Sequence, residues 1–407
     1  MNKLFYCILT TGLLFCLNAC TNDDVTGNDL PAKPIELTLQ QIEKANADNR
    51  FSFQVFKEVS VIDDNMFFSP LSLNIALGML YNGTAGDART EMAEVMGMAD
   101  FTDTEINTYF QKMSQALLKV DPKTQISIAN SIWYRNNFTV KQPFIDVNKK
   151  YFDAQVQALD FSKPEAADII NKWCADKTKN LIKEIVEKPI PRNVVMYLIN
   201  ALYFKSKWKN QFDKANTKSE DFTKKDNQKK KVNMMALTAN MPYYADEYLQ
   251  CVEIPYGNQA FSMVALLPAD DKNLDQLINY LDNDRWQNIV KNLNPRDVWL
   301  KLPRFKIECD ILLNEPVYNV GIKRIFWGGL DNIACGDLFV SKIQQKTFVE
   351  VNEEGTEAAA VTAIEIRESV NPDMPVSFFA NRPFLYLIKE KSTGVILFIG
   401  RMDNPIE

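Results

Sequence analysis

The chain contains no histidine among its 407 residues. Catalysis of the Ser-His-Asp and Cys-His kinds needs an imidazole, because that group moves protons near neutral pH. Histidine-ligated zinc sites are excluded for the same reason. An enzyme built on this sequence would have to use carboxylate or lysine chemistry, and no motif indicates a metal ion or an organic cofactor. The missing imidazole therefore makes an enzymatic function less expected.

Cysteine is also scarce, with seven in the chain and no CxxC pair. Cys7 and Cys16 lie in an apolar N-terminal stretch. Beyond position 20 there are four, which are Cys174, Cys251, Cys309 and Cys335. An even number in an exported protein permits disulfides. Wide spacing and a large core favour free thiols instead, and the sequence leaves their state open.

Long apolar runs are absent except at the N-terminus, where Lys3 precedes an apolar stretch over residues 4–17. That stretch is too short for a stable membrane span, so residues 1–19 are interpreted as a signal peptide. Leu17-Asn18-Ala19-Cys20 resembles a bacterial lipobox, which predicts a lipid on Cys20. Residues 20–36 then form a polar tether, and we expect an exported outer-membrane lipoprotein, exposed at the surface. The alternative is an ordinary signal peptide that is cut nearby.

Charge gives no sign of a nucleic-acid partner, because the net charge is −6. A basic run at Lys224, Lys225 and residues 229–231 is interpreted as a solvated turn. Beyond residue 36 there is no linker, repeat or low-complexity tract. One domain over residues 37–407 is therefore expected.

Hydrophobic periodicity places helices early in the domain and strands later. Ser69-Pro70 is a helix start signal, because Ser can cap a helix and Pro fits its first turn. Helices are expected over 40–59, 71–81, 84–96 and 166–173, and strands over 126–134, 194–204, 261–267, 298–307, 384–388 and 395–399. Such an order is typical of an α+β fold.

Several segments match one protein family in order and spacing. They are Asn65-Met66-Phe67-Phe68-Ser69-Pro70-Leu71-Ser72, Asn200-Ala201-Leu202-Tyr203-Phe204-Lys205 with Lys207-Trp208 and Phe212, Val232-Asn233-Met234-Met235, Leu302-Pro303-Arg304-Phe305, and Phe379-Ala380-Asn381-Arg382-Pro383-Phe384. Together they resemble the serpin family over nearly all of residues 37–407. The resemblance implies three β-sheets, about nine helices and an exposed reactive-centre loop at about residues 353–376.

The segment from Glu353 to Ala360 resembles the hinge of that loop in inhibitory serpins, with Glu353, Gly355, Thr356, Ala358 and Ala360 as its hinge residues. From Thr356 onward the residues alternate. One face carries Thr356, Ala358, Ala360, Thr362, Ile364 and Ile366, and the other carries every charge. This is the pattern of a strand with one buried face. A surface helix is the alternative for the Ala- and Glu-rich part alone.

A strand pattern in a segment that must lie exposed before use is what loop insertion needs. The resemblance therefore implies a suicide-substrate inhibitor of serine endopeptidases, monomeric and not an enzyme. Family spacing places the reactive bond at Ser369-Val370, which suits an elastase- or subtilisin-like peptidase. Arg367 and Glu368 are the alternatives, and they imply trypsin-like and Glu-specific targets. Cysteine peptidases also stay open as targets.

The resemblance also implies a shutter region that controls the opening of the large sheet. Its residues here are Ser69, Ser72, Asn200 and Gln345. Gln345 stands where many family members carry a histidine, so no pH-sensing role is expected at that position. Gln can still bridge two polar partners. Local capping and sheet hydrogen bonding, without gating, is the alternative.

Two other functions stay open. A non-inhibitory serpin that acts as a carrier or chaperone would be expected to show bulky or charged inward residues in the hinge, and this chain does not. A lipid-anchored surface glycan-binding protein would be favoured by a cluster of exposed aromatic residues, which the sequence does not indicate.

Overall fold

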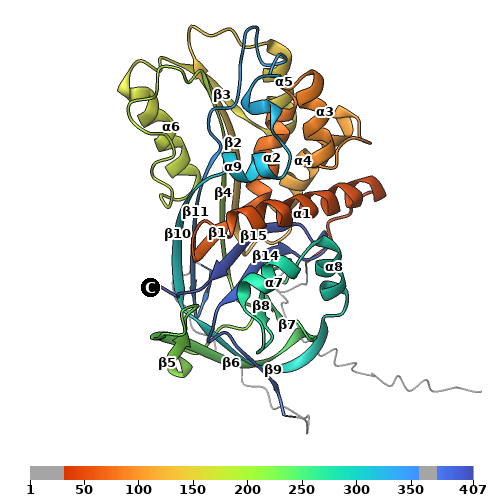
Figure 1. Ribbon diagram of the computed structural model, residues 1–407, viewed down its shortest axis with the longest axis vertical. Helices are drawn as coiled ribbons and strands as arrows, with labels where there is room; N and C mark the ends of the chain where they lie inside the picture. Colours follow the sequence, from red (N-terminus) through yellow and green to blue (C-terminus); the bar gives the residue numbers. More distant parts are fainter. Residues whose placement is uncertain (1–31, 357–373, 407) are drawn as a thin grey trace, which may run out of the picture.

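Residues 32–356 and 374–406 are described by the computed structural model (Figure 1). The helices are α1 (Leu39–Val59), α2 (Pro70–Tyr81), α3 (Gly86–Val95), α4 (Asp103–Leu117), α5 (Gln142–Phe152), α6 (Pro164–Lys177), α7 (Leu274–Tyr280), α8 (Asn283–Lys291) and α9 (Asn314–Asn319), with short 3-10 turns η1 (Lys214–Asn216) and η2 (Arg324–Phe326). Figure 1 shows α2 to α5 gathered at one end of the molecule and β5, β6 and β9 at the other. Within the described ranges, no helix is long and apolar enough to cross a membrane.

The strands form two hydrogen-bonded sheets among the described residues. The strands are β1 (Asn65–Phe68), β2 (Gln125–Arg135), β3 (Gln155–Leu159), β4 (Met196–Lys207), β5 (Lys218–Thr223), β6 (Lys229–Ala245), β7 (Leu249–Pro255), β8 (Phe261–Pro268), β9 (Asn294–Pro303), β10 (Phe305–Leu312), β11 (Gln344–Asn352), β12 (Gly355–Thr356), β13 (Val376–Phe379), β14 (Phe384–Glu390) and β15 (Ile396–Met402). The six-stranded sheet has the order β10-β11-β12-β4-β2-β3.

The nine-stranded sheet has two parts that meet at the long strand β6. One part is β1-β15-β14-β8-β7, and the other joins β6 to β5, β9 and β13. Counted with the six-stranded sheet, these parts correspond to the three sheets that the sequence predicts. Nine α-helices in the described residues agree with the predicted number, and the α+β class is confirmed.

Local signals explain where the first helices start. Thr38 and Gln41 form a capping box at the start of α1, each side chain hydrogen-bonded to the other's backbone N–H. The Ser69 hydroxyl accepts a hydrogen bond from the Ser72 N–H, and Pro70 occupies the first turn of α2. Both helices therefore begin within one residue of the predicted position.

The strand predicted over 298–307 is wrong as a single element. It ends at Pro303, and Phe305 begins β10 in the other sheet. Arg304 lies between them and donates its backbone N–H to the Asn233 carbonyl at 2.9 Å. The apolar alternation continues across this corner because both strands bury one face, so hydropathy alone could not show the change of sheet.

Helix α6 covers one face of the six-stranded sheet, as Figure 1 shows. Its apolar residues pack with Trp133 on β2 and with Ile199 and Ala201 on β4. The even-numbered residues of β4 face the opposite side, where Phe204 contacts Tyr256 and Phe261 of the main core. The two faces of β4 are therefore both covered, which fixes this strand as the central one.

Candidate functional site

Strands β4 and β11 are bridged by β12, which has only two residues. Thr356 pairs with Val351 on β11 and with Ser206 on β4. Gly355 pairs with Asn352 and Lys207 in the same way. In the described part of the chain, no strand pairing joins β4 to β11 directly. Gly355 and Thr356 thus keep β4 and β11 apart at one end of the sheet, and we call these two residues the wedge.

The wedge differs from the sequence-based expectation of a hinge that lies outside the sheet. Gly355 and Thr356 are buried and already paired on both sides. The physical reason is that Gly355 lets the backbone approach β4 closely, while the β-branched Thr356 suits a paired strand. The hinge in this state has therefore started to insert.

Thr356 points toward the core, on the face that the period-two pattern assigns to it. It is 3% exposed. Its hydroxyl lies 2.6 Å from the Tyr256 hydroxyl, and either group can be the donor. Tyr256 stacks on Trp208 with ring centroids 4.4 Å apart, and burial raises the pKa of Tyr256 above its ordinary value. Thr356, the first inward-facing residue of the hinge, thus makes a polar contact with Tyr256 beside the aromatic ring of Trp208.

Gly355 allows the two backbones to approach closely. A Cβ atom at this position would lie 2.1 Å from the Ser206 carbonyl oxygen and 2.7 Å from the Lys207 Cα. Both are backbone atoms of β4, so no side-chain rotation can relieve the contact. Only glycine fits the position where the hinge first enters the sheet.

Glu353, just before the wedge, is held by an ion pair. Its carboxylate accepts hydrogen bonds from Arg304 Nε at 2.8 Å and from the Thr217 hydroxyl at 2.6 Å. Burial alone would raise the pKa of Glu353, but the hydrogen bonds from Arg304 and Thr217 outweigh it and lower the pKa. The carboxylate is therefore charged at neutral pH and ties the hinge to two other segments.

Backbone contacts fix the same turn against the end of β4. The Trp208 N–H donates to the Glu354 carbonyl and the Phe212 N–H to the Glu353 carbonyl, both at 2.9 Å. The Trp208 indole donates to the Asn352 carbonyl at 2.8 Å. In the sequence, Trp208 and Arg304 stand out only as parts of family motifs. Their contacts with the hinge could not be inferred, because Arg304 and Glu353 lie 49 residues apart in the chain.

The shutter residues are brought together only in part. Gln345 accepts from the Ser69 N–H at 2.7 Å and donates to the Ser69 carbonyl at 2.9 Å. The Ser69 hydroxyl donates to the Leu397 carbonyl at 2.8 Å and accepts from the Ser72 N–H at 3.2 Å. Gln345 thus links β11 to the start of α2 through an amide that does not titrate.

Asn200 is hydrogen-bonded to Asn130 and not to another shutter residue. Its side-chain N–H donates to Asn130 Oδ1 at 2.7 Å, and the Asn130 amide in turn donates to the Phe152 carbonyl at 2.7 Å. The carbonyl acceptor on Phe152 fixes the orientation of Asn130, which then fixes that of Asn200. As a result, Asn200 Oδ1 is buried without a hydrogen-bond partner.

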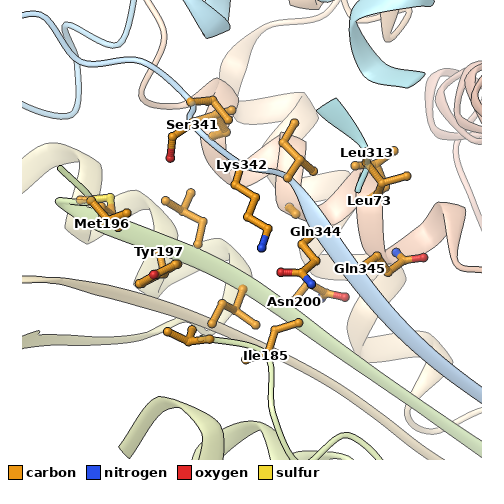
Figure 2. Close-up of a pocket in the computed structure, with 18 of the residues that line it drawn as sticks. Leu73, Ile185, Met196, Tyr197, Asn200, Leu313, Ser341, Lys342, Gln344 and Gln345 are labelled. Carbon is orange, nitrogen blue, oxygen red and sulfur yellow. The ribbon is translucent and has the colours of Figure 1, made fainter. Parts of the chain in front are cut away.

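A cavity of about 610 Å³ separates β4 from β11 beyond the wedge. Figure 2 shows Tyr197 and Asn200 on one wall and Lys342, Gln344 and Gln345 on the other. The remaining wall is mostly apolar and includes Leu73, Leu80, Phe138, Leu198, Leu313 and Ile343. Lys342 is paired with Glu187 at 2.8 Å. The cavity lies where an additional strand of this sheet would run.

The other predicted site residues lie outside the described part of the chain. They are Cys20, Ala358, Ala360, Arg367, Glu368, Ser369 and Val370. Among the described residues, no group of three or more acidic or cysteine side chains could hold a metal ion. Cys174, Cys251, Cys309 and Cys335 are free thiols, and burial raises the pKa of Cys174 to about 12.

Comparison with known proteins agrees with this geometry. The family model described as serpin (serine protease inhibitor) matches residues 46–405. Iripin-1 of Ixodes ricinus is 32% identical over 402 residues, which cover 96% of this chain and 98% of that protein. Neuroserpin of Homo sapiens is 34% identical over 362 residues, covering 84% of this chain and 87% of that protein.

Solved structures of similar fold include a thermophilic serpin and a thyroxine-binding relative. The thermophilic serpin tengpin in its native state has a TM-score of 0.82 at 30% identity, covering 92% of this chain and 96% of its own. Thyroxine-binding globulin in complex with thyroxine has a TM-score of 0.79 at 25% identity, covering 89% and 99%.

A mixed-sheet protein with a hinge wedged into its central sheet is the class that fold and site define, and the chain belongs to the serpin family. Serpins are mostly protease inhibitors rather than enzymes, and the family also has non-inhibitory members such as thyroxine-binding globulin.

Proposed function

We propose that this serpin inhibits serine endopeptidases by suicide-substrate trapping, with its own loop inserting between β4 and β11. One observation carries the proposal. The two hinge residues of β12 already pair with both neighbouring strands, and the cavity continues beyond them along the same line. A target peptidase cuts the loop and forms an acyl-enzyme, and the freed arm then completes the sheet with the peptidase attached.

The register of β12 predicts the partners of the arm. Continuing the same antiparallel pairing places Ala358 opposite Val349 and Phe204, and Ala360 opposite Thr347 and Leu202. Small side chains at these two positions suit passage between two strands. Thr362 would then reach the level of Gln345 and Asn200. Glu365 would lie opposite Lys342.

The free energy available is large enough for the task. An inserted arm would form a dozen or so ladder hydrogen bonds at roughly 1 kcal/mol each. That total is comparable with the whole stability of a typical domain, about 5–15 kcal/mol. Distortion of a peptidase active site is therefore within reach of loop insertion.

The proposed reactive bond is Ser369-Val370, with an elastase- or subtilisin-like serine peptidase as target. The proposal also includes export and a lipid on Cys20 that anchors the protein to the outer membrane. Residues 20–36 would then separate the lipid from the domain by a short polar tether. Both parts rest on sequence patterns alone.

The test is incubation with a panel of serine and cysteine peptidases, followed by denaturing gels and mass spectrometry. We expect a covalent complex that survives boiling in detergent and a released C-terminal peptide that starts at Val370. A peptide starting at Ser369 or Glu368 would move the reactive bond and the target class with it. Cleavage of the loop without a stable complex would favour a non-inhibitory carrier.

A further inference from the structure

Strand β9 carries a tryptophan on the solvent-facing side of its sheet. Val298 and Leu300, its neighbours in the strand, are fully buried, whereas Trp299 is 42% exposed. The Trp299 ring meets the Phe379 ring edge-on, with the two centroids 4.9 Å apart. Phe379 belongs to β13, which runs parallel to β9 in the nine-stranded sheet. Trp299 is therefore oriented by its neighbour and still presents much of its surface to another molecule.

A paired lysine lies beside the two aromatic rings. The Lys301 Nζ atom is 5.5 Å from the Trp299 ring centroid and 5.2 Å from the Phe379 centroid. The same ammonium group donates to both carboxylate oxygens of Glu220 on β5, at 2.7 and 2.8 Å. Because this charge is already matched within the protein, recognition by Trp299 is apolar and aromatic rather than ionic. We call Trp299, Lys301 and Phe379 the tryptophan patch.

The tryptophan patch lies at the base of the reactive loop. Ser377 on β13 pairs with Trp299, and Met374, just before β13, is 91% exposed. Tryptophan and methionine are both enriched at protein interfaces. A fully extended chain from Val370 to Ser377 spans at most about 25 Å. The proposed reactive bond is therefore tethered close to the patch.

A peptidase bound at the proposed reactive bond would come near this base. Protease–inhibitor interfaces bury about 800 Å² on each partner, which corresponds to a disc of about 16 Å radius. The body of a peptidase is wider than that disc. An enzyme seated on Ser369-Val370 would therefore bring its surface to Trp299 unless the loop were fully extended away from the sheet.

We propose that the tryptophan patch is a second contact for the target peptidase, outside the reactive loop, and that it favours peptidases with an apolar rim beside their active-site cleft. The inference rests on the proposed inhibitory function. A tighter encounter complex gives the peptidase more time to attack the loop before it dissociates. The patch has no part in loop insertion, because β9 and β13 do not belong to the six-stranded sheet that β4 and β11 form.

The test is the rate at which the full-length protein forms covalent complexes with pancreatic elastase and with subtilisin. Trp299→Ala should lower the second-order rate about tenfold, the effect of removing one central interface tryptophan. The number of serpin molecules consumed per peptidase trapped should not change, since insertion is untouched. Trp299→Phe should recover most of the rate, because an aromatic ring remains beside Phe379. The rate difference should persist at high salt, since no charge pair is involved.

Trp327→Ala is the matched control. Trp327 is 78% exposed and follows η2, which packs beside α3 at the end of the molecule opposite β9 (Figure 1). This variant should trap peptidases at the wild-type rate. Equal rates for wild type and Trp299→Ala with every peptidase that is trapped would overturn the second contact and leave the proposed function intact. An equal loss in Trp327→Ala would also overturn it. If the wild type traps neither peptidase, the proposed function fails, and this inference fails with it.

Discussion

Thr356→Arg tests the two-face interpretation of the hinge most directly. Thr356 is 3% exposed, lies between Val351 and Ser206 in the sheet, and contacts the Tyr256 hydroxyl. Arginine at this position cannot stay in the sheet without burying its charge among aromatic side chains. The cost of such a burial is several kcal/mol, which reduces the population of the seated hinge at least about 100-fold.

We expect the peptidase to recognise and cut the Thr356→Arg variant, but to escape instead of being trapped. The reactive bond lies far along the loop from position 356, so the peptidase should cut the variant at a normal rate. Residue 356 would no longer be paired between β4 and β11 when insertion begins. Insertion would therefore be slow, and the acyl-enzyme would hydrolyse before the loop completes the sheet. The assay is the number of serpin molecules consumed per peptidase inhibited, with the covalent complex measured on a denaturing gel.

Glu357→Arg is the matched control, because the pattern places residue 357 on the opposite face and an arginine there would reach water. We expect this variant to inhibit nearly as well as the wild type. If both variants inhibit equally well, or fail equally, the alternation does not define an inward and an outward face, and the proposed insertion register is wrong.

Four further predictions follow from the same site and from the N-terminus. Gly355→Ala should unseat the hinge by contact with the Ser206 carbonyl and lower the melting temperature by a few degrees, as followed by calorimetry. Because the folded pKa of Glu353 is lowered, its contribution to stability should be complete above its ordinary pKa of about 4.3 and be lost as the pH falls through the folded value. The melting difference between wild type and Glu353→Gln should therefore shrink below about pH 4, and a constant difference would contradict the ion pair with Arg304. Cutting the loop should raise the melting temperature by on the order of 15 °C, since roughly a dozen hydrogen bonds form; equal melting of cut and intact protein would mean that the hinge does not insert. Mass spectrometry of the membrane-extracted protein should find an acyl group on Cys20, and Cys20→Ala should release a soluble domain that still inhibits.

Much of the fold could be predicted because single residues mark its boundaries. Ser69-Pro70 fixes the start of α2, and the long apolar run predicted over 194–204 became β4 with its limits moved by a few residues. The elements that were not predicted, such as β5, β6 and β7, have mixed patterns. Strand β6, for example, pairs at its two ends with different neighbours, so its burial does not follow one period.

The candidate site was predictable in residue type but not in contacts. The inward direction of Thr356 followed from alternation alone. Its seating in the sheet did not, because pairing with Val351 and Ser206 depends on two strands far away in the chain. The partner of Asn200 was missed for the same reason, since Asn130 lies 70 residues before it and carries no motif of its own.

The shape of the cavity between β4 and β11 determines which kind of segment can pair with both strands. Two strand edges with unpaired backbone groups would ordinarily attract other chains. Here they face each other across a slot bridged by β12, so only an extended segment can satisfy both at once. In the proposed mechanism, the arm that the cut frees stays covalently attached at the mouth of this slot, and tethering of this kind corresponds to an effective concentration in the millimolar range. A segment of a second copy at micromolar concentration would then be outcompeted about a thousandfold by the freed arm, so a cut molecule would close its own sheet rather than that of a neighbour.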